Sequence, residues 1–175
     1  MPRCRNCRKK FEAVHFNQKY CFESACAKVW YQKAKEENSK KLHKKWKQEL
    51  KSTRDYLKEA QVWFYKYVRM RDACMPCISC NKVMTDKYDA GHYYSAGGHS
   101  ILRFHEDNVH AQCVHCNQYL SGNLLNYQEG LVNRIGKERV LDLSKIANNE
   151  KRWEKTELQS IIKEYKEKCK YLMHK

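Results

Sequence analysis

Eight of the ten cysteines in this chain fall into two groups of four whose spacing is that of metal ligands. The groups are Cys4-x2-Cys7 with Cys21-x4-Cys26, and Cys77-x2-Cys80 with Cys113-x2-Cys116. Each close pair can form a knuckle that supplies two thiolates, and two knuckles complete a tetrahedral Zn(Cys)4 site. We therefore expect two structural zinc ions. The first would supply folding energy that residues 1–26 cannot obtain from hydrophobic burial alone.

Free thiols or a disulfide are the alternative for these cysteines. The first residues contain no apolar segment typical of a secretory signal, so we expect the chain to stay in a reducing compartment, where disulfides are rare. In the second group, Cys74 allows a shifted ligand pair with Cys77. That pair would enclose Pro76, which has no N–H to donate to a thiolate, so Cys77 with Cys80 is preferred. Cys74 and Cys169 are then expected to be small, buried, apolar residues.

The charge of the chain predicts a polyanionic partner. Its 35 Lys and Arg residues outnumber its 20 Asp and Glu residues, which gives a formal net charge of +15. Eight thiolates and two bound zinc ions would lower this to about +11, which is still strongly basic. No run approaches the roughly 18 apolar residues that a membrane span requires, so a membrane protein is not expected.

Long segments of the chain have helical periodicity. No glycine precedes Gly91, and 27–72 lacks any helix breaker. The second half of that segment has the wide apolar stripe of a helix packed on a core, with Ser52 or Thr53 as its N-cap. Helices are expected over 28–51, 53–72, 124–135, 138–143 and 156–173. The parts of the chain are expected to be a zinc finger over 1–27, a basic helical linker over 28–52, a domain around the second zinc site over 53–145 and an amphipathic helix over 146–175.

The basic linker carries six lysines that are candidates for DNA contact. A solvated helix face is the alternative interpretation of this run. The six are Lys40, Lys41, Lys44, Lys45, Lys47 and Lys51.

The connection between the two pairs of the second group holds more than a structural zinc ribbon needs. Its aromatic residues predict a strand over 88–94, a turn near Gly97-Gly98 and a return strand over 101–104. A short helix is expected to begin in 114–120. A hairpin followed by a helix, closed by zinc, would bring together His92, Asn108 and Asn117.

These residues carry a family resemblance. The string is Asp89-Ala-Gly-His92, Leu102-Arg-Phe, Asn108-x-His110-x2-Cys113-x2-Cys116-Asn117 and Ser121-Gly122-Asn123. It resembles the ββα-metal (HNH) nuclease motif in the variant with Asn at its last position. With the N-terminal cysteine group and the basic helix, the chain resembles the NinG (Rap) recombination endonucleases of lambda-like phages over nearly its whole length. The resemblance implies an α+β fold, with a zinc-clamped ββα-metal nuclease core in 53–145, flanking helices and an N-terminal Cys4 zinc finger.

Phosphodiester hydrolysis requires an activated water and a cation that neutralises the developing charge. A neutral imidazole can take the proton of that water near pH 7, so His92 is the expected general base. Asn117 offers a hard amide oxygen suited to one Mg²⁺ or Mn²⁺. By resemblance, Asn108 holds its loop or orients His92, and Arg103 is a candidate to hold a phosphate or the leaving group.

Two positions depart from the family pattern. Many HNH motifs carry an Asp or His ligand immediately before the base, where this chain has Gly91, and Asp89 is the candidate replacement. The helix position that often holds Lys is Leu120, so a phosphate contact from that position is not expected.

The resemblance implies a metal-dependent endonuclease that cuts branched recombination intermediates, such as Holliday junctions and D-loops, and leaves 5′-phosphate and 3′-hydroxyl ends. Two cuts related by a two-fold axis imply a homodimer, with 28–51 and 156–173 as candidate contact helices. Recombination proteins are further expected partners, and the cytoplasm of a bacterial host is the expected location. The alternatives are a non-catalytic zinc module that binds nucleic acid and an HNH nuclease that acts on ordinary duplex DNA.

Overall fold

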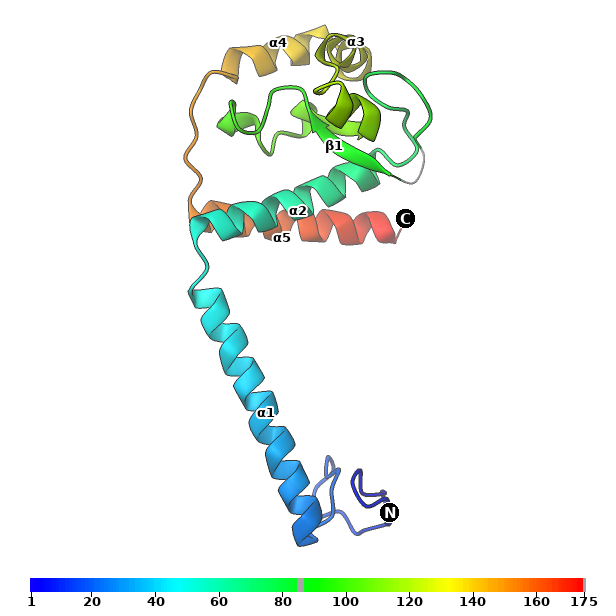
Figure 1. Ribbon diagram of the computed structural model, residues 1–175, viewed down its shortest axis with the longest axis vertical. Coiled ribbons are helices and arrows are strands. Elements are labelled where there is room, and N and C mark those ends of the chain that lie inside the picture. The colour runs from blue at the N-terminus through cyan, green and yellow to red at the C-terminus, as the bar shows by residue number, and fades with distance from the viewer. Residues whose placement is uncertain (85–86, 175) are drawn as a thin grey trace. The chain divides into compact units, whose positions relative to one another are not determined.

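The computed structural model describes residues 1–84 and 87–174 (Figure 1). The chain divides into two compact units, an N-terminal unit of Met1–Lys51 and a C-terminal unit of Ser52–Lys175. Helices combine with one two-stranded sheet, so the expected α+β class is confirmed. Among the helices of the described residues, none has both the length and the apolar composition needed to cross a membrane.

The N-terminal unit consists of the first four-cysteine group and helix α1 (Ser24–Glu49). Cys4 and Cys26 are buried and pack with Phe11, so the cysteines themselves form the small core of this unit. The apolar residues Leu42 and Trp46 of α1 are exposed, and so is Leu50, which follows the last residue of the helix.

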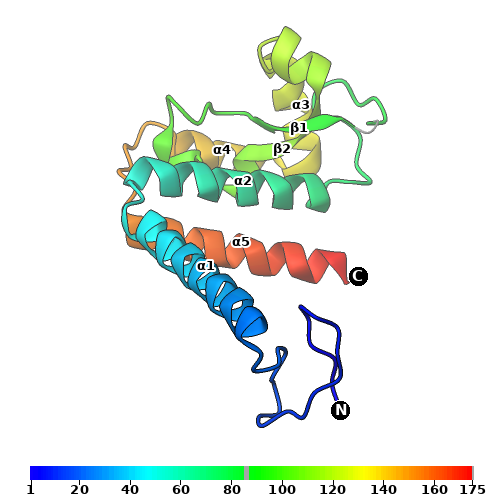
Figure 2. The ribbon, with the colours of Figure 1, turned by 60° about the horizontal axis from the view of Figure 1, so that its bottom comes forward.

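The C-terminal unit is layered around helix α2 (Thr53–Arg71). Figures 1 and 2 show α2 between the sheet and helix α5 (Lys155–Met173). Ser52 is the N-cap of α2: its hydroxyl accepts a hydrogen bond from the Asp55 N–H, and the Asp55 carboxylate accepts one from the Ser52 N–H. The buried face of α2 packs against α5 and strand β2, as the wide stripe predicted; this core comprises Ala60, Phe64, Val68, Phe104, Val109, Leu158, Ile162 and Tyr165.

The sheet pairs β1 (Tyr88–His92) with β2 (Val109–Cys113) in antiparallel register, with His92 opposite Val109. The prediction of a return strand over 101–104 is therefore wrong. That segment begins with a single 3-10 turn, Ser100–Leu102. Leu102 and Phe104 are buried in two different core clusters, whereas alternate residues of a strand point to the same face. The turn allows both side chains to be buried.

A second core lies between the knuckle of Ile78 and two helices, α3 (Leu124–Ile135) and α4 (Lys137–Ile146). These helices lie close to the predicted ranges. The short helix predicted to begin in 114–120 is one turn of π-helix, His115–Tyr119.

A buried carboxylate joins α2 to the sheet and α3. Asp72, 4% exposed, accepts hydrogen bonds from the Arg71 side chain at 2.7 Å and from the Ala111 N–H at 2.9 Å. His110 and Arg134 lie 3.6 and 3.7 Å from the same carboxylate. Burial alone would raise the pKa of Asp72, but hydrogen bonds from His110 and Arg71 hold it well below its usual range. The ionised carboxylate thus ties strand β2 to helices α2 and α3 at one point.

Candidate metal centres and adjoining polar pocket

The two predicted cysteine groups each converge on one point. Within each group the four sulfur atoms all lie within 4.8 Å of one another. Sulfurs bonded to one tetrahedral zinc at about 2.3 Å would lie about 3.8 Å apart. The Cys7–Cys21 and Cys80–Cys113 sulfur pairs lie 3.7 and 3.9 Å apart, which fits zinc and is far too long for a disulfide. Both groups can therefore hold a metal ion such as zinc.

Backbone N–H groups favour the thiolate form of one cysteine at each centre. The N–H of Cys113 lies 3.4 Å from the Cys77 sulfur, and the N–H of Cys21 lies 3.4 Å from the Cys4 sulfur. Burial opposes ionisation, but these and neighbouring backbone donors lower the pKa of Cys77 to about 7 and of Cys4 to about 6. Such donors are typical of thiolates that bind metal.

The two remaining cysteines differ from each other. Cys169 is buried, as expected, and lies against the carbonyl of Trp63. Cys74 is exposed, so the expectation that it is a buried apolar residue is wrong. It follows the end of α2, where the chain turns towards Cys77 over the surface, and no core is available to it there.

The second centre is tied to the turn that follows the π-helix. Ser121, Gly122 and Asn123 all have positive φ, of 49°, 89° and 46°. This sharp turn lets the Asn123 amide reach the Cys116 sulfur at 3.5 Å. The buried Gln112 amide donates to the Gly122 carbonyl at 2.6 Å and to the Ser79 hydroxyl at 2.7 Å. These contacts hold the Cys77–Cys80 knuckle, strand β2 and the turn at 121–123 together.

His92 is the last residue of β1, and its ring is held in one orientation. Its Nε2 atom lies 3.1 Å from the Arg103 carbonyl oxygen, and the Tyr65 ring packs edge-on at 5.5 Å between centroids. A carbonyl only accepts, so Nε2 carries the proton and Nδ1 keeps its lone pair. Burial lowers the pKa of His92, and the nearby Arg103 charge lowers it further, against the opposing effect of the carbonyl. The imidazole is therefore neutral at pH 7.

Asp89 and Asn117 form a second polar pair. The Asn117 amide donates to Asp89 Oδ2 at 2.9 Å, and the Gln118 amide donates to the same oxygen at 2.8 Å. Gly91 lies on the same strand and packs closely against Gln112: a Cβ at position 91 would overlap the side-chain oxygen of Gln112. An Asp or His ligand at position 91 would therefore require Gln112 to move. The acidic residue of β1 is Asp89 instead.

These residues line one open pocket of about 480 Å³. It brings together three of the predicted site residues, namely Asp89, His92 and Asn117, and it also includes Tyr65 and Arg69 of α2. A carboxylate, an amide and a neutral imidazole at one surface can bind a hard cation and accept a proton.

Asn108 and Arg103 lie outside the lining of this pocket. Asn108 is fully buried; it accepts from the Tyr94 N–H at 2.8 Å and donates to the carbonyls of Tyr94 and Leu102. It thus holds the loop between the strands, whose Arg103 carbonyl contacts His92. The Arg103 side chain has a buried Nε without a hydrogen-bond partner among the described residues.

Sequence reasoning missed Tyr65, Arg69 and Gln118 as pocket residues. Tyr65 and Arg69 are four residues apart and therefore share one helix face, separate from the core residues Phe64 and Val68. That second, polar-aromatic face of α2 was the signal available. The six candidate lysines belong to the N-terminal unit; five are exposed on α1, and Lys51 is half-buried.

Comparisons with known proteins give a consistent result. A family profile described as "Bacteriophage Lambda NinG protein" matches residues 1–175. Protein ninG of Escherichia phage lambda is 35% identical over 190 residues, covering 97% of this chain and 92% of the relative. Protein ninG of Salmonella phage P22 is 34% identical, covering 97% of this chain and 93% of the relative. Protein ninG of Enterobacteria phage H19B is 41% identical over 112 residues, covering 64% of this chain and 55% of the relative. No solved structure matches the chain.

Proposed function

The chain belongs to the bacteriophage lambda NinG family, and on that premise we propose that it is a metal-dependent endonuclease of the ββα-metal (HNH) type that cuts branched DNA in phage recombination. The observation that carries the proposal is the state of His92 beside the Asp89–Asn117 pair. A base and a set of hard oxygen donors line the same pocket. The family resemblance of the surrounding motif supplies the reaction type.

His92 is prepared to act as a general base. The Arg103 carbonyl fixes the proton on Nε2, so Nδ1 is the atom that takes a proton from the attacking water. The lowered pKa keeps the ring neutral at physiological pH. Tyr65 and Asn108 fix the position of the imidazole. Tyr65 packs against the ring, and Asn108 holds the loop that carries the Arg103 carbonyl.

Asp89 and Asn117 fit a hard divalent cation by the chemistry of their donors. A carboxylate and an amide oxygen are ligands that Mg²⁺ and Mn²⁺ accept, with water and a phosphate oxygen filling the remaining positions. When bound, such an ion would neutralise charge that develops on the phosphate. Asp89 and Asn117 are already within hydrogen-bond distance of each other, which places both side chains at one point of the pocket.

The surface next to the pocket supports a polyanionic substrate. A second cavity of about 660 Å³ shares Arg69, Asp89 and Gln118 with the first, and Lys66 and Lys87 extend it. Three cations along one groove suit a phosphate backbone that enters the candidate active site. The exposed lysines of α1 (Lys40, Lys41, Lys44, Lys45 and Lys47), together with the half-buried Lys51, would add sequence-independent contacts.

Cleavage of a synthetic four-way junction tests this function. The zinc-loaded full chain should cut the junction when Mg²⁺ or Mn²⁺ is added and leave it intact without them. Unlabelled junction should compete better than duplex of the same length. Binding without cutting under all metal conditions would instead indicate a non-catalytic zinc module. Equal competition by duplex would indicate a nuclease for ordinary DNA.

Resolution of a four-way junction requires two cuts, so we propose that the active form is a homodimer. Sedimentation of the chain with and without junction DNA measures this. A monomer on the junction at concentrations that support paired cuts would contradict it.

A further inference from the structure

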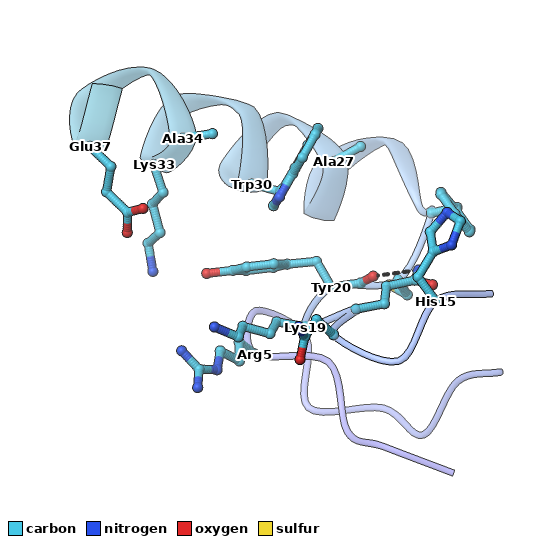
Figure 3. A pocket seen from close by; sticks show the side chains of 13 residues that line it. Arg5, His15, Lys19, Tyr20, Ala27, Trp30, Lys33, Ala34 and Glu37 are labelled. Carbon is cyan, nitrogen blue, oxygen red and sulfur yellow. Dashed lines mark hydrogen bonds between the residues drawn. The ribbon is translucent and has the colours of Figure 1, made fainter. Parts of the chain in front are cut away.

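A large cavity lies inside the N-terminal unit, apart from the proposed nuclease site. Its volume is about 710 Å³, and it is bounded by the segment that leads into Cys21 of the first centre and by the first turns of α1 (Figure 3). The residues of interest in its lining are Arg5, Lys19, Tyr20, Trp30, Lys33 and Glu37.

The metal knuckle holds this cavity in shape. Tyr20 directly precedes Cys21, whose N–H lies 3.4 Å from the Cys4 sulfur. The Tyr20 carbonyl accepts a hydrogen bond from the Gln18 amide at 2.9 Å, and the Arg5 N–H donates to the Lys19 carbonyl at 2.9 Å. The wall that carries Tyr20 is therefore anchored to the first zinc centre.

Two aromatic side chains of this cavity are more than half exposed. Figure 3 shows the Trp30 side chain on α1 and the Tyr20 side chain on the knuckle on opposite sides of the opening. Trp30 is 55% exposed, and Phe22, also in the lining, is 72% exposed. Exposed aromatic faces beside positive charge are the usual platform for bases of a single strand.

Positive charge gathers at one end of the same cavity. Figure 3 shows Arg5, Lys19 and Lys33 extending towards the end where the Tyr20 hydroxyl lies. The Lys33 ammonium is 5.8 Å from the Tyr20 ring centroid. Glu37 is the acidic residue of the lining, so three cationic side chains stand against one carboxylate in this cavity.

We propose that this cavity binds an unpaired nucleotide, with its base between Tyr20 and Trp30 and its phosphate against Arg5, Lys19 and Lys33. A paired base in a duplex has both faces covered by its neighbours, whereas an unpaired base offers a free face together with a phosphate. The N-terminal unit would thereby recognise single-stranded segments of branched DNA. Binding at this cavity requires no cleavage, so it can hold or fail independently of the nuclease proposal.

The test is fluorescence anisotropy with zinc-loaded full chain, without Mg²⁺ or Mn²⁺, on a labelled oligothymidylate and on a matched duplex. Trp30→Ala should weaken binding of the single strand roughly fivefold to a hundredfold, the range for one stacked base. Binding of the duplex should not change. Trp46→Ala is the matched control, because Trp46 is 59% exposed on the same helix and lies outside the cavity lining. It should leave both affinities unchanged.

Charge provides a second, independent readout. Lys33→Gln should reduce the slope of log affinity against log salt by about 0.7 for the single strand. The proposal is overturned if Trp30→Ala binds oligothymidylate like the wild type, or if it weakens duplex binding to the same degree. Zinc content is measured for each variant. If Trp30→Ala loses zinc, Lys33→Gln decides: a smaller slope supports the cavity as the binding site, and an unchanged slope overturns it.

Discussion

The Nε2 atom of His92 lies 3.1 Å from the backbone carbonyl of Arg103, so the tautomer of this histidine is set by a loop eleven residues further along the chain. Asn108 in turn holds that loop through the Leu102 carbonyl. The proposed base thus depends on a backbone position rather than on a charged partner. The carbonyl carries no charge, so it raises the pKa of His92 less than a carboxylate would, and the lowering of the pKa by burial is the largest effect.

This geometry predicts the acid limb of the pH–rate profile. Burial lowers the pKa of His92 below its ordinary value of about 6.5. Protonated His92 cannot accept a proton, so the cleavage rate should be full at neutral pH and should fall as the pH drops through this lowered pKa. Single-turnover rates of junction cleavage between pH 5 and pH 8 measure the midpoint. A midpoint above about 6.5 in the wild type would contradict the assignment.

Substitution of Tyr65 tests whether burial by its ring contributes to the lowered pKa of His92. Tyr65→Ala removes the ring that packs on His92 and should move the acid limb upwards towards the ordinary histidine value. Tyr65→Phe keeps the ring and should behave like the wild type. An acid limb that is the same in the alanine variant would mean that Tyr65 does not set the environment of His92.

Asp89→Asn tests the proposed cation ligands. The substitution keeps the shape of the side chain but removes its charge, so the Mg²⁺ or Mn²⁺ concentration for half-maximal cleavage should rise by at least about tenfold. The melting temperature and junction affinity should not change. Asp142→Asn, which alters an exposed acid paired with Lys145, is the control and should leave the metal requirement as it is. A normal metal requirement in Asp89→Asn would remove Asp89 from the site.

The cysteine groups predict two zinc ions for each chain. Metal analysis of Cys77→Ser should show the loss of one ion, together with a lower melting temperature for the C-terminal unit, because structural zinc binding is coupled to folding. Cys4→Ser should also lose one ion. Cys74→Ser is the matched control, because Cys74 lies three residues from Cys77 and is exposed. It should retain both ions, and loss of zinc from it would show that the shifted ligand pair is used.

The buried Asp72 should make the fold sensitive to substitution and to acid. Asp72→Asn leaves Arg71 and Arg134 without their carboxylate and should lower the free energy of unfolding by about 3–5 kcal/mol. The pKa of Asp72 is depressed in the folded state, so its stabilising effect is present above the unfolded value near pH 4 and is lost as the pH falls below it. Urea unfolding at pH 7 and pH 3 should therefore show a smaller difference between variant and wild type in acid. An equal difference at both pH values would contradict this role.

The spacing of cysteines and the periodicity of helices were readable from the sequence because each depends on neighbours in the chain. Cys77 and Cys80 signal a knuckle by their spacing, and Phe64 and Val68 signal a helix face by theirs. The capping pair of Ser52 and Asp55 is equally local, with the two residues three positions apart.

The strand β2 shows what such reasoning cannot reach. Its sequence alternates apolar and polar residues as a half-buried strand does, yet the polar residues His110 and Gln112 are buried like their apolar neighbours. Their partners, Asp72 and Ser79, lie more than thirty positions earlier in the sequence. The same holds for Tyr65, whose contact with His92 depends on how α2 packs on the sheet. Burial of polar residues is set by such distant partners.

The most direct test of the proposed function is the single-turnover rate of junction cleavage by His92→Ala under saturating Mg²⁺ or Mn²⁺. We expect a rate about 10²- to 10⁴-fold below that of the wild type, with unchanged junction affinity and unchanged zinc content. His43→Ala, which removes an exposed histidine of α1, should cleave like the wild type. A His92→Ala rate within about tenfold of the wild-type rate would contradict the assignment of His92 as the general base.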